Sequence, residues 1–301
     1  MESKSVYYFI IRLLIYAMVG TVLTQVIGSI GIEMLFKNHG TTSLVSLGEK
    51  YPDSWYFIRI LQLINSVFTF LIPSLIVWKL FSGTYNFFNT RELRSSKKAF
   101  LFIPILLISF FPLVQALYVF NLNIDFPEPL QSIFMQMEEQ MNSLIKGMLQ
   151  NHSIAAITMN VFIIVIVAAF LEEIFFRGVL QRILTFYVDS HIAILFAAFF
   201  FSAIHMQFFG FLPRFALGIL FGYMYWKTNR LMVPIMSHLI FNGLQLASYY
   251  WTNQFATNPN PVTEQPYSIW ITVPSIIIFF ILYYIFHNYF TNNATKENGI
   301  E

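Results

Sequence analysis

The chain has 301 residues, of which 57% are hydrophobic and 11% are charged, and its net charge is +2. A soluble domain carries about a quarter charged residues, so most of this surface does not face water. The small net charge, without basic stripes interleaved with aromatic residues, argues against a nucleic-acid partner. Cysteine is absent, which excludes disulfides, thiolate metal ligands and a cysteine nucleophile.

Eight apolar segments are candidates for membrane-crossing helices, which need about 20 residues each. They cover residues 7–30, 57–80, 99–121, 154–185, 191–206, 213–227, 231–251 and 268–290. The first contains the run from Leu13 to Ile30, which is too long for a signal-peptide core, so we expect a retained span. Ten-residue alternation typical of membrane strands does not occur. The predicted fold is an all-α, polytopic membrane helix bundle.

The distribution of Lys and Arg predicts the orientation of these spans. With the N-terminus inside, twelve of these residues fall in inside segments and five in outside segments. Because positive charge concentrates on the cytoplasmic side, we expect both termini in the cytoplasm and the protein in the plasma membrane. The tryptophans fall at predicted span ends, as interfacial anchors do; they are Trp55, Trp78, Trp226, Trp251 and Trp270.

One segment between the third and fourth spans has a different pattern. From Leu130 to Met148, apolar residues recur with helical spacing, while Glu138, Glu139 and Lys146 lie on the other face. This pattern predicts an amphipathic helix on the outer membrane interface. The alternative is a movable cover or a substrate-contacting element.

Two adjacent carboxylates follow an apolar run in the fourth span, and ionisable residues inside membrane helices are functional candidates. Glu173 and Arg177 are four residues apart, so they share a helix face and can pair. Glu172 is rotated from Glu173 by about 100°. We expect Glu172 to face a cavity, where a poorly solvated carboxylate can act as a general base. The structural alternative is that both glutamates neutralise Arg177 and Arg182.

His205 lies near the end of the otherwise apolar fifth span. The fourth and fifth spans are antiparallel and joined by a turn near residues 187–191, so Glu172 is level with residue 206 and therefore with His205. Two ionisable groups at one depth in the membrane indicate a shared site. The alternative is a hydrogen-bonded histidine that only serves packing.

His238 and Asn242 are four residues apart in the seventh span and therefore share one helix face. An imidazole and a carboxamide presented together can donate hydrogen bonds to a developing oxyanion. The alternative is a polar clamp between helices, since Asn and His often join helices in membranes.

The fifth and sixth spans also carry features of close packing. Gly218 and Gly222 are a pair of small residues four apart, which allows a neighbouring helix to approach closely. Both spans have about 15 residues, fewer than a full crossing needs. We therefore expect their connecting turn, with Gln207 and Gly210, to dip into the membrane beside His205, against a water-filled cavity.

Three motifs occur in order on consecutive membrane helices. They are EExxxR, from Glu172 to Arg177; FxxxH, from Phe201 to His205; and HxxxN, from His238 to Asn242. Together they resemble the CAAX-protease and bacteriocin-processing family (Abi, CPBP) of intramembrane proteases. The resemblance covers roughly residues 154–245. It makes residues 151–251 the expected catalytic core, between an N-terminal part, 1–150, and a last span with a polar tail, 252–301.

The resemblance implies hydrolysis of peptide bonds in membrane-associated or hydrophobic peptides. In family terms, Glu172 with His205 activates the attacking water, and His238 and Asn242 stabilise the oxyanion. The paired glutamate and arginine of the first motif support the site. The expected partners are therefore membrane lipids and a membrane-associated peptide or protein, without nucleic acid.

The family is often called metalloprotease, and Glu172, His205 and His238 form a chemically plausible zinc set. The chain has no H-E-x-x-H motif, however, and a glutamate-activated water needs only the same residues, so we favour a metal-free mechanism. A different class of function is a non-enzymatic membrane protein of bacteriocin-immunity or envelope-regulatory type. A solute transporter is disfavoured, because matching broken helices in two halves are not found.

Overall fold

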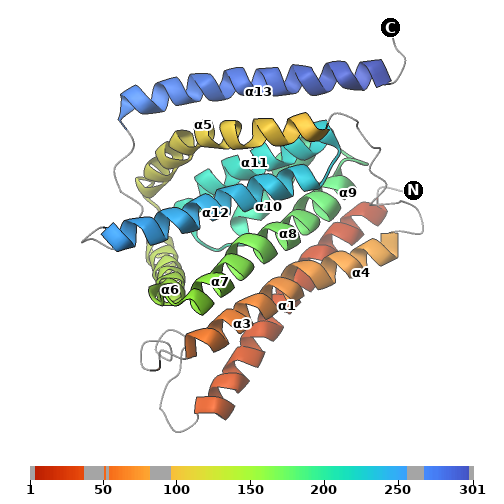
Figure 1. The fold of residues 1–301 in the computed structure, drawn as a ribbon. Coiled ribbons are helices and arrows are strands. Elements are labelled where there is room, and N and C mark those ends of the chain that lie inside the picture. Colours follow the sequence, from red (N-terminus) through yellow and green to blue (C-terminus); the bar gives the residue numbers. More distant parts are fainter. Residues whose placement is uncertain (1–3, 37–50, 52–53, 82–95, 256–267, 298–301) are drawn as a thin grey trace. The chain divides into compact units, whose positions relative to one another are not determined.

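The computed structural model describes residues 4–36, 51, 54–81, 96–255 and 268–297. Within these ranges every regular element is a helix, so the all-α prediction is confirmed (Figure 1). The chain divides into two compact units. The first unit comprises Met1–Phe87 and Ser132–Tyr187, and the second comprises Phe88–Gln131 and Val188–Glu301. The expected division at residues 150 and 251 stays a prediction.

Six helices in the described ranges are long and apolar enough to cross a membrane. They are Tyr8–Met34, Ser54–Leu80, Phe102–Leu122, Ile154–Leu184, Phe208–Thr228 and Ile269–Phe290. The predicted count of eight is not confirmed. The segment 191–206 contributes a helix of only 14 residues, α10 (Ser190–Ala203). The segment 231–251 lies in α12 (Met232–Phe255), which is 24 residues long, but its polar side chains lower its hydropathy.

Besides α6 (Leu130–Gln150), the first unit contains three long helices among the described residues, and two of them change between α-helical and π-helical winding. They are α1 (Lys4–Phe36); α3 (Ser54–Ser66) continued by η1 (Val67–Leu71) and α4 (Ile72–Phe81); and α7 (Ile154–Asn160) continued by η2 (Val161–Val167), α8 (Ala168–Glu173), η3 (Ile174–Gln181) and α9 (Arg182–Leu184). The segments η1, η2 and η3 are π-helical, with wider turns than an α-helix. The two glutamates of α8 therefore lie on a short α-helical stretch between two π-helical ones.

Aromatic packing holds this acid-bearing helix against its neighbour in the first unit. Phe70 of η1 lies 5.5 Å from the Phe175 ring and 5.9 Å from the Phe176 ring. Both of the latter side chains are completely buried. Phe175 and Phe176 lie two and three residues after Glu173, so their packing limits how far the helix can rotate about its axis.

A buried arginine ties three helices of the first unit together. Arg59 of α3 is fully buried, and its Nε donates to Oδ1 of Asn160 at 2.8 Å. Its guanidinium also donates to the Met148 carbonyl, which accepts a second bond from Asn160 Nδ2 at 3.0 Å. Arg59 is one of the five Lys and Arg residues expected in outside segments. The structure buries it, and an amide and a carbonyl accept its hydrogen bonds.

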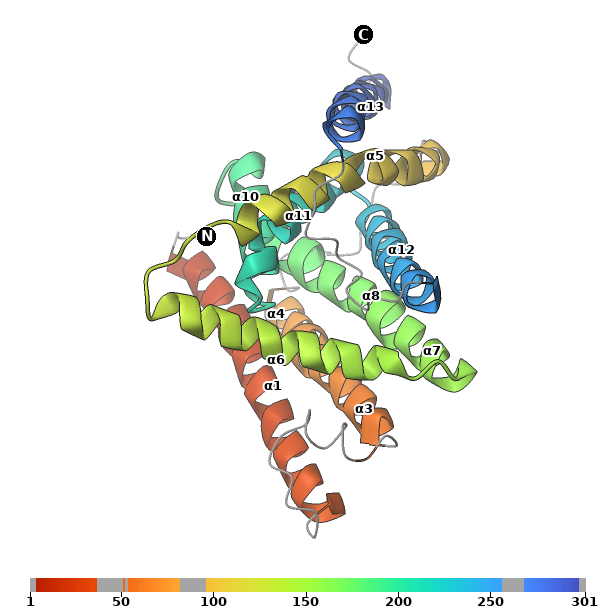
Figure 2. The same ribbon diagram turned by 90° about the vertical axis from the view of Figure 1, so that its left-hand side faces the viewer.

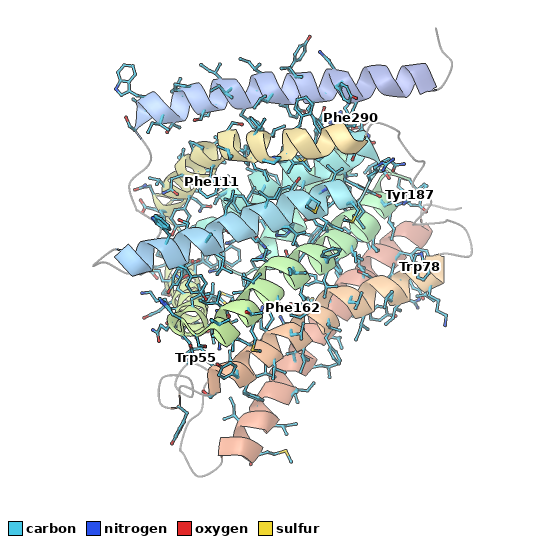
Figure 3. All side chains as sticks on the ribbon, in the orientation of Figure 1. Trp55, Trp78, Phe111, Phe162, Tyr187 and Phe290 are labelled. Atoms are coloured by element: carbon cyan, nitrogen blue, oxygen red, sulfur yellow. The ribbon has the colours of Figure 1, made fainter. Side chains whose placement is uncertain are left out.

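The predicted amphipathic helix is α6 (Leu130–Gln150), which runs crosswise to α1 (Figure 2). Only its C-terminal end is well buried, through Gly147, Met148 and Leu149. A Cβ atom at Gly147 would overlap the Trp55 ring, so only glycine permits this contact. Trp55 thus lies at the expected span end but is packed under α6, whereas Trp78 marks the opposite end of the same long helix (Figure 3).

The second unit is built around a central helix. Its elements are α5 (Ser96–Leu122), α10, η4 (Phe208–Gly210), α11 (Phe211–Thr228), α12 and α13 (Ile269–Glu297). The helix α11 contacts α5, α10, α12 and α13, and α13 lies along α5 (Figures 1 and 2). A Cβ atom at Gly218 would lie 2.9 Å from Ala198 of α10, which confirms the predicted close helix approach at this glycine.

Candidate active site

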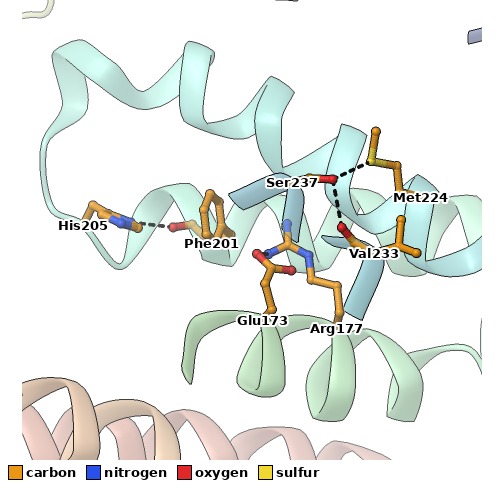
Figure 4. A network of polar contacts seen from close by, with 7 residues as sticks. All are labelled: Glu173, Arg177, Phe201, His205, Met224, Val233 and Ser237. Carbon is orange, nitrogen blue, oxygen red and sulfur yellow. Dashed lines mark hydrogen bonds and ion pairs between the residues drawn. The ribbon is translucent and has the colours of Figure 1, made fainter. Parts of the chain in front are cut away.

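The ion pair predicted from sequence spacing is present in the first unit. Glu173 Oε1 and Arg177 Nη1 are 2.8 Å apart, and both side chains are completely buried (Figure 4). The pair forms across the junction between α8 and the π-helical η3. Both partners belong to the same continuous helix, so the pair neutralises two buried charges on one face of that helix. The prediction that these two residues pair is therefore confirmed.

Glu172 precedes this pair on α8, and its side chain retains 8% exposure, whereas Glu173 has none. One residue along a helix corresponds to a rotation of about 100°, so the two carboxylates point in different directions. The helix thus separates a carboxylate engaged in the ion pair from a second one on another face. The cavity expected beside Glu172 and the role of its carboxylate as a general base stay predictions.

His205 follows the end of α10 in the second unit. Its Nδ1 lies 2.7 Å from the Phe201 carbonyl (Figure 4). A carbonyl oxygen only accepts, so Nδ1 carries the proton and Nε2 of a neutral ring is the acceptor. This hydrogen bond sets both the tautomer and the direction of the imidazole. Nε2 is therefore the basic nitrogen of the neutral His205 ring.

The turn after His205 is fixed by side chains from α5 and α10. Asn121 Nδ2 donates to the Phe208 carbonyl at 3.0 Å, and Asn121 Oδ1 accepts from the Leu212 backbone N–H at 2.7 Å. Ser202 Oγ donates to the Phe211 carbonyl at 2.7 Å. Asn121 was missed in the sequence, where an asparagine at the end of a span looks like a boundary residue. Its side chain thus joins the first residue of η4 to the second residue of α11.

The same turn contains Gln207 and Gly210, but the sixth span is not short as expected, because Phe208–Thr228 has 21 residues, enough for a crossing. The dip of the turn into the membrane stays a prediction. The Arg214 guanidinium donates to the Gln207 carbonyl, and Gly210 lies against that guanidinium. Met206 has a left-handed φ of 55° directly after His205. The backbone therefore reverses sharply between α10 and α11.

Phe201 contacts both histidines of the motifs, His205 and His238. Its ring centroid lies 5.4 Å from that of His205 and 5.7 Å from that of His238, in edge contact with both. The other side of His238 meets Phe221 at 5.3 Å. His238 is therefore held between two phenylalanines, with 5% of its surface exposed. The phenylalanine of the FxxxH motif therefore contacts both imidazoles: its carbonyl accepts a hydrogen bond from His205, and its ring lies against both rings.

Asn242 follows His238 by one turn of the same helix, α12, and is partly exposed. The predicted shared face of these two residues thus agrees with the observed helix. Glu172, Glu173 and Arg177 belong to the first unit, and His205, His238 and Asn242 to the second. The common site of all six, and the common depth of Glu172 and His205, stay predictions.

Within each unit, the described residues contain no group of three or more His, Asp or Glu placed to hold a metal ion. The candidate zinc ligands come from both units, Glu172 from one and His205 and His238 from the other. The hydrogen bond between His205 Nδ1 and a backbone carbonyl is the arrangement that metal-ligating histidines commonly have. The donor types thus suit zinc, and metal dependence stays a prediction.

The fold and these residues define an integral, multi-pass helical membrane protein with ionisable groups inside its helices. Residues 154–244 match the Rce1-like family, described as Type II CAAX prenyl endopeptidase Rce1-like. This stretch contains all three motifs, which confirms the resemblance to the CAAX-protease family; at family level the match is to a CAAX-type protease, a hydrolase. Neither the curated proteins nor the solved structures contain a match to this chain.

Proposed function

We propose that this chain is an intramembrane endopeptidase that hydrolyses peptide bonds of membrane-anchored or hydrophobic peptides. The observation that carries this proposal is that all three motifs, from Glu172 to Asn242, fall within the segment matching the Rce1-like family. The proposal places the protein in the plasma membrane with both termini in the cytoplasm. Its partners are membrane lipids and the peptide substrate.

In the proposed reaction, the Glu172 carboxylate accepts a proton from a water molecule whose oxygen attacks the scissile carbonyl carbon. His205 orients this water through Nε2, because Nδ1 is engaged by the Phe201 carbonyl. The negative charge that develops on the carbonyl oxygen accepts hydrogen bonds from His238 and Asn242. When the tetrahedral intermediate collapses, the C–N bond breaks and the Glu172 proton passes to the leaving amine.

The arrangement of the imidazoles supports these roles. A general base or a water-orienting group needs a fixed direction, and the His205 ring has a carbonyl on one side and the Phe201 ring beside it. His238, between two phenylalanine rings, is equally restricted. The ion pair of Glu173 and Arg177 neutralises the buried charges next to Glu172, and the packing of Phe175 and Phe176 on Phe70 limits the rotation of the helix.

We favour a metal-free reaction, in which these side chains alone activate water. If zinc binds, Glu172, His205 and His238 would hold it, and the metal would polarise the water and the carbonyl. Removal of metals by a chelator, followed by metal analysis of the protein, tests this preference. Retained activity in metal-depleted protein supports it, whereas loss of activity that zinc restores contradicts it.

The decisive experiment begins with comparative membrane proteomics of cells that carry wild type or Glu172→Gln. A substrate precursor should accumulate in the variant, and purified wild-type protein in liposomes should cleave it. Loss of a general base lowers such rates by about 10²–10⁴-fold. Glu139→Gln, on the exposed face of α6, is the matched control and should keep the wild-type rate.

The competing function is a non-enzymatic membrane protein that uses the same scaffold. It requires that the biological effect survives Glu172→Gln and His205→Ala but not disruption of the fold. Equal cleavage by wild type and Glu172→Gln would instead remove Glu172 as the base. The two results are distinct, because one concerns the biological effect and the other the rate of the isolated protein.

A further inference from the structure

A second polar cluster lies in the second unit, at the opposite end of α10 from His205. It gathers where α10 begins, where α11 ends and near the end of the apolar span of α13. We name it the basic–aromatic cluster; its residues are His191, Tyr223, Trp226, Lys227 and His287. None of them belongs to the three protease motifs. Four of the five lie within or beside the segment that matches the Rce1-like family, while His287 lies outside it.

Direct contacts connect these five side chains. Lys227 Nζ lies 4.5 Å from the ring centroid of Trp226 and 6.0 Å from that of Tyr223. The His191 ring meets the Trp226 ring at 4.9 Å. The Tyr223 hydroxyl forms a hydrogen bond with Nδ1 of His287, which joins α11 to α13. Residues from three helices therefore build one cluster rather than a row along a single helix.

The cluster combines hydrogen-bond donors with amphipathic rings. An ammonium group and two imidazoles can donate to the oxygens of a phosphate, and the lysine supplies a positive charge. Tryptophan and tyrosine prefer the headgroup level of a membrane, where one edge is apolar and the other is hydrated. One neighbouring group is an acid: the Asp189 carboxylate accepts the backbone N–H of His191 at the start of α10. Tyr283, in tilted contact with Tyr223, is neutral.

The surface next to this cluster is apolar and exposed. On α13, the turns that precede His287 present Phe280, Ile281 and Tyr284, which are 57%, 54% and 65% exposed. In a membrane-spanning helix such a face lies against acyl chains. A phosphate bound at His287 and Lys227 would therefore lie at the top of a lipid-facing surface, which suits a phospholipid better than a soluble phosphate.

We propose that the basic–aromatic cluster binds the phosphate of an anionic phospholipid headgroup, whose acyl chains follow the exposed face of α13. The orientation predicted from Lys and Arg puts this end of the unit on the cytoplasmic side, where anionic lipids attract basic residues. The proposal is independent of the protease chemistry, because the cluster contains none of the candidate catalytic residues.

The test uses the full-length protein purified in neutral detergent. Phosphatidylglycerol and, separately, phosphatidylcholine are titrated, and bound lipid is counted by native mass spectrometry while thermal unfolding is followed. Phosphatidylglycerol should bind and stabilise the protein more than phosphatidylcholine does. Lys227→Gln should weaken phosphatidylglycerol binding about fivefold, which is the effect of one cation near a membrane surface. Lys227→Arg, which keeps the charge, should bind like wild type.

Controls separate the site from general effects. Lys79→Gln changes another exposed span-end lysine, in the first unit, and should leave the affinity unchanged. Combining Lys227→Gln with His287→Gln should reduce phosphatidylglycerol binding to the level of phosphatidylcholine. Because the lipid-dependent shift is compared within each variant, a less stable variant is still informative. Glu172→Gln should bind the lipid normally, so a failed protease proposal leaves this test intact.

Three outcomes would overturn the proposal. Equal binding of both lipids by wild type would show that the headgroup charge is not recognised. Unchanged phosphatidylglycerol affinity in the double variant would place the lipid elsewhere. Displacement of the lipid by inorganic phosphate at equal concentration would show a soluble-phosphate site, without a contribution from the acyl chains.

Discussion

The two units hold their motif residues by different means; the acid half is Glu172, Glu173 and Arg177 in the first unit, and the imidazole half is His205, His238 and Asn242 in the second. In the first unit, several buried polar side chains carry formal charges, as in the Glu173–Arg177 pair and in Arg59, which donates to Asn160 and to a backbone carbonyl. In the second unit, neutral side chains bond to the backbone. His205 uses the Phe201 carbonyl, and Asn121 bridges two backbone groups of the turn that follows.

This difference has energetic consequences. Removing one member of a buried ion pair leaves a charge without its partner in a medium of low dielectric constant, which is costly. Removing a neutral donor leaves only an unsatisfied carbonyl or N–H, at a smaller cost. We therefore expect changes in the acid half to act first on stability. Changes in the imidazole half should act first on geometry, and thus on rate.

The largest effect should come from Arg177→Met. This change leaves the fully buried Glu173 carboxylate without its cation, and we expect a loss of about 3–5 kcal/mol in the free energy of unfolding. Unfolding in mixed micelles, followed by circular dichroism, measures this loss. The double variant Arg177→Met with Glu173→Gln should recover much of it, since the remaining side chain is neutral. A loss below about 1 kcal/mol in the single variant would show that the pair behaves like an exposed one.

An intermediate effect is expected for Asn121→Leu. Two hydrogen bonds to the turn around η4 disappear, and at about 1 kcal/mol each the expected loss of stability is about 2 kcal/mol. Because this turn follows His205 directly, peptide cleavage should slow by more than the stability loss explains. The rate is measured at saturating substrate on fully folded protein.

Asn123→Ala is the matched control for that change. Asn123 lies two residues further on, is exposed, and donates to the Val119 carbonyl of its own chain segment. Its loss should cost less than about 0.5 kcal/mol, as surface changes do, and should leave the cleavage rate unaltered. Equal effects of the two substitutions would contradict a specific role of Asn121 in holding the turn.

The sequence predicted those contacts that depend on helical spacing. Glu173 and Arg177 are four residues apart, and the pair follows from the period of the helix. Gly218 was expected to allow a close helix approach, and Ala198 is the neighbour found there. The order of the three motifs was sufficient to identify the family that residues 154–244 match.

The contacts of Arg59 and Asn121 could not be predicted in this way. Arg59 bonds to a residue 101 positions away, and Asn121 to one 87 positions away, and periodicity carries no information about such distant partners. The count of spans was uncertain for a related reason. The helix α10 is short, and His205 follows its end. The helix α12 is rich in polar side chains, and it carries His238 and Asn242. The polar residues that a site requires lower the hydropathy by which a membrane span is recognised in the sequence.

The smallest effect should come from Ser237→Ala, next to His238. The Ser237 hydroxyl donates to the Val233 carbonyl at 2.9 Å and also contacts the Met224 sulfur (Figure 4). A bond from serine to the carbonyl four residues earlier competes with the helix rather than supporting it, so its removal should change stability by less than about 0.5 kcal/mol. His238 keeps its orientation through the rings of Phe201 and Phe221, and the cleavage rate should therefore remain within about twofold of wild type, as for substitutions away from the reacting groups. A large loss of stability here, comparable to that of Arg177→Met, would abolish the distinction between the two units, because a neutral hydroxyl bonded to the backbone would then matter as much as a buried charge.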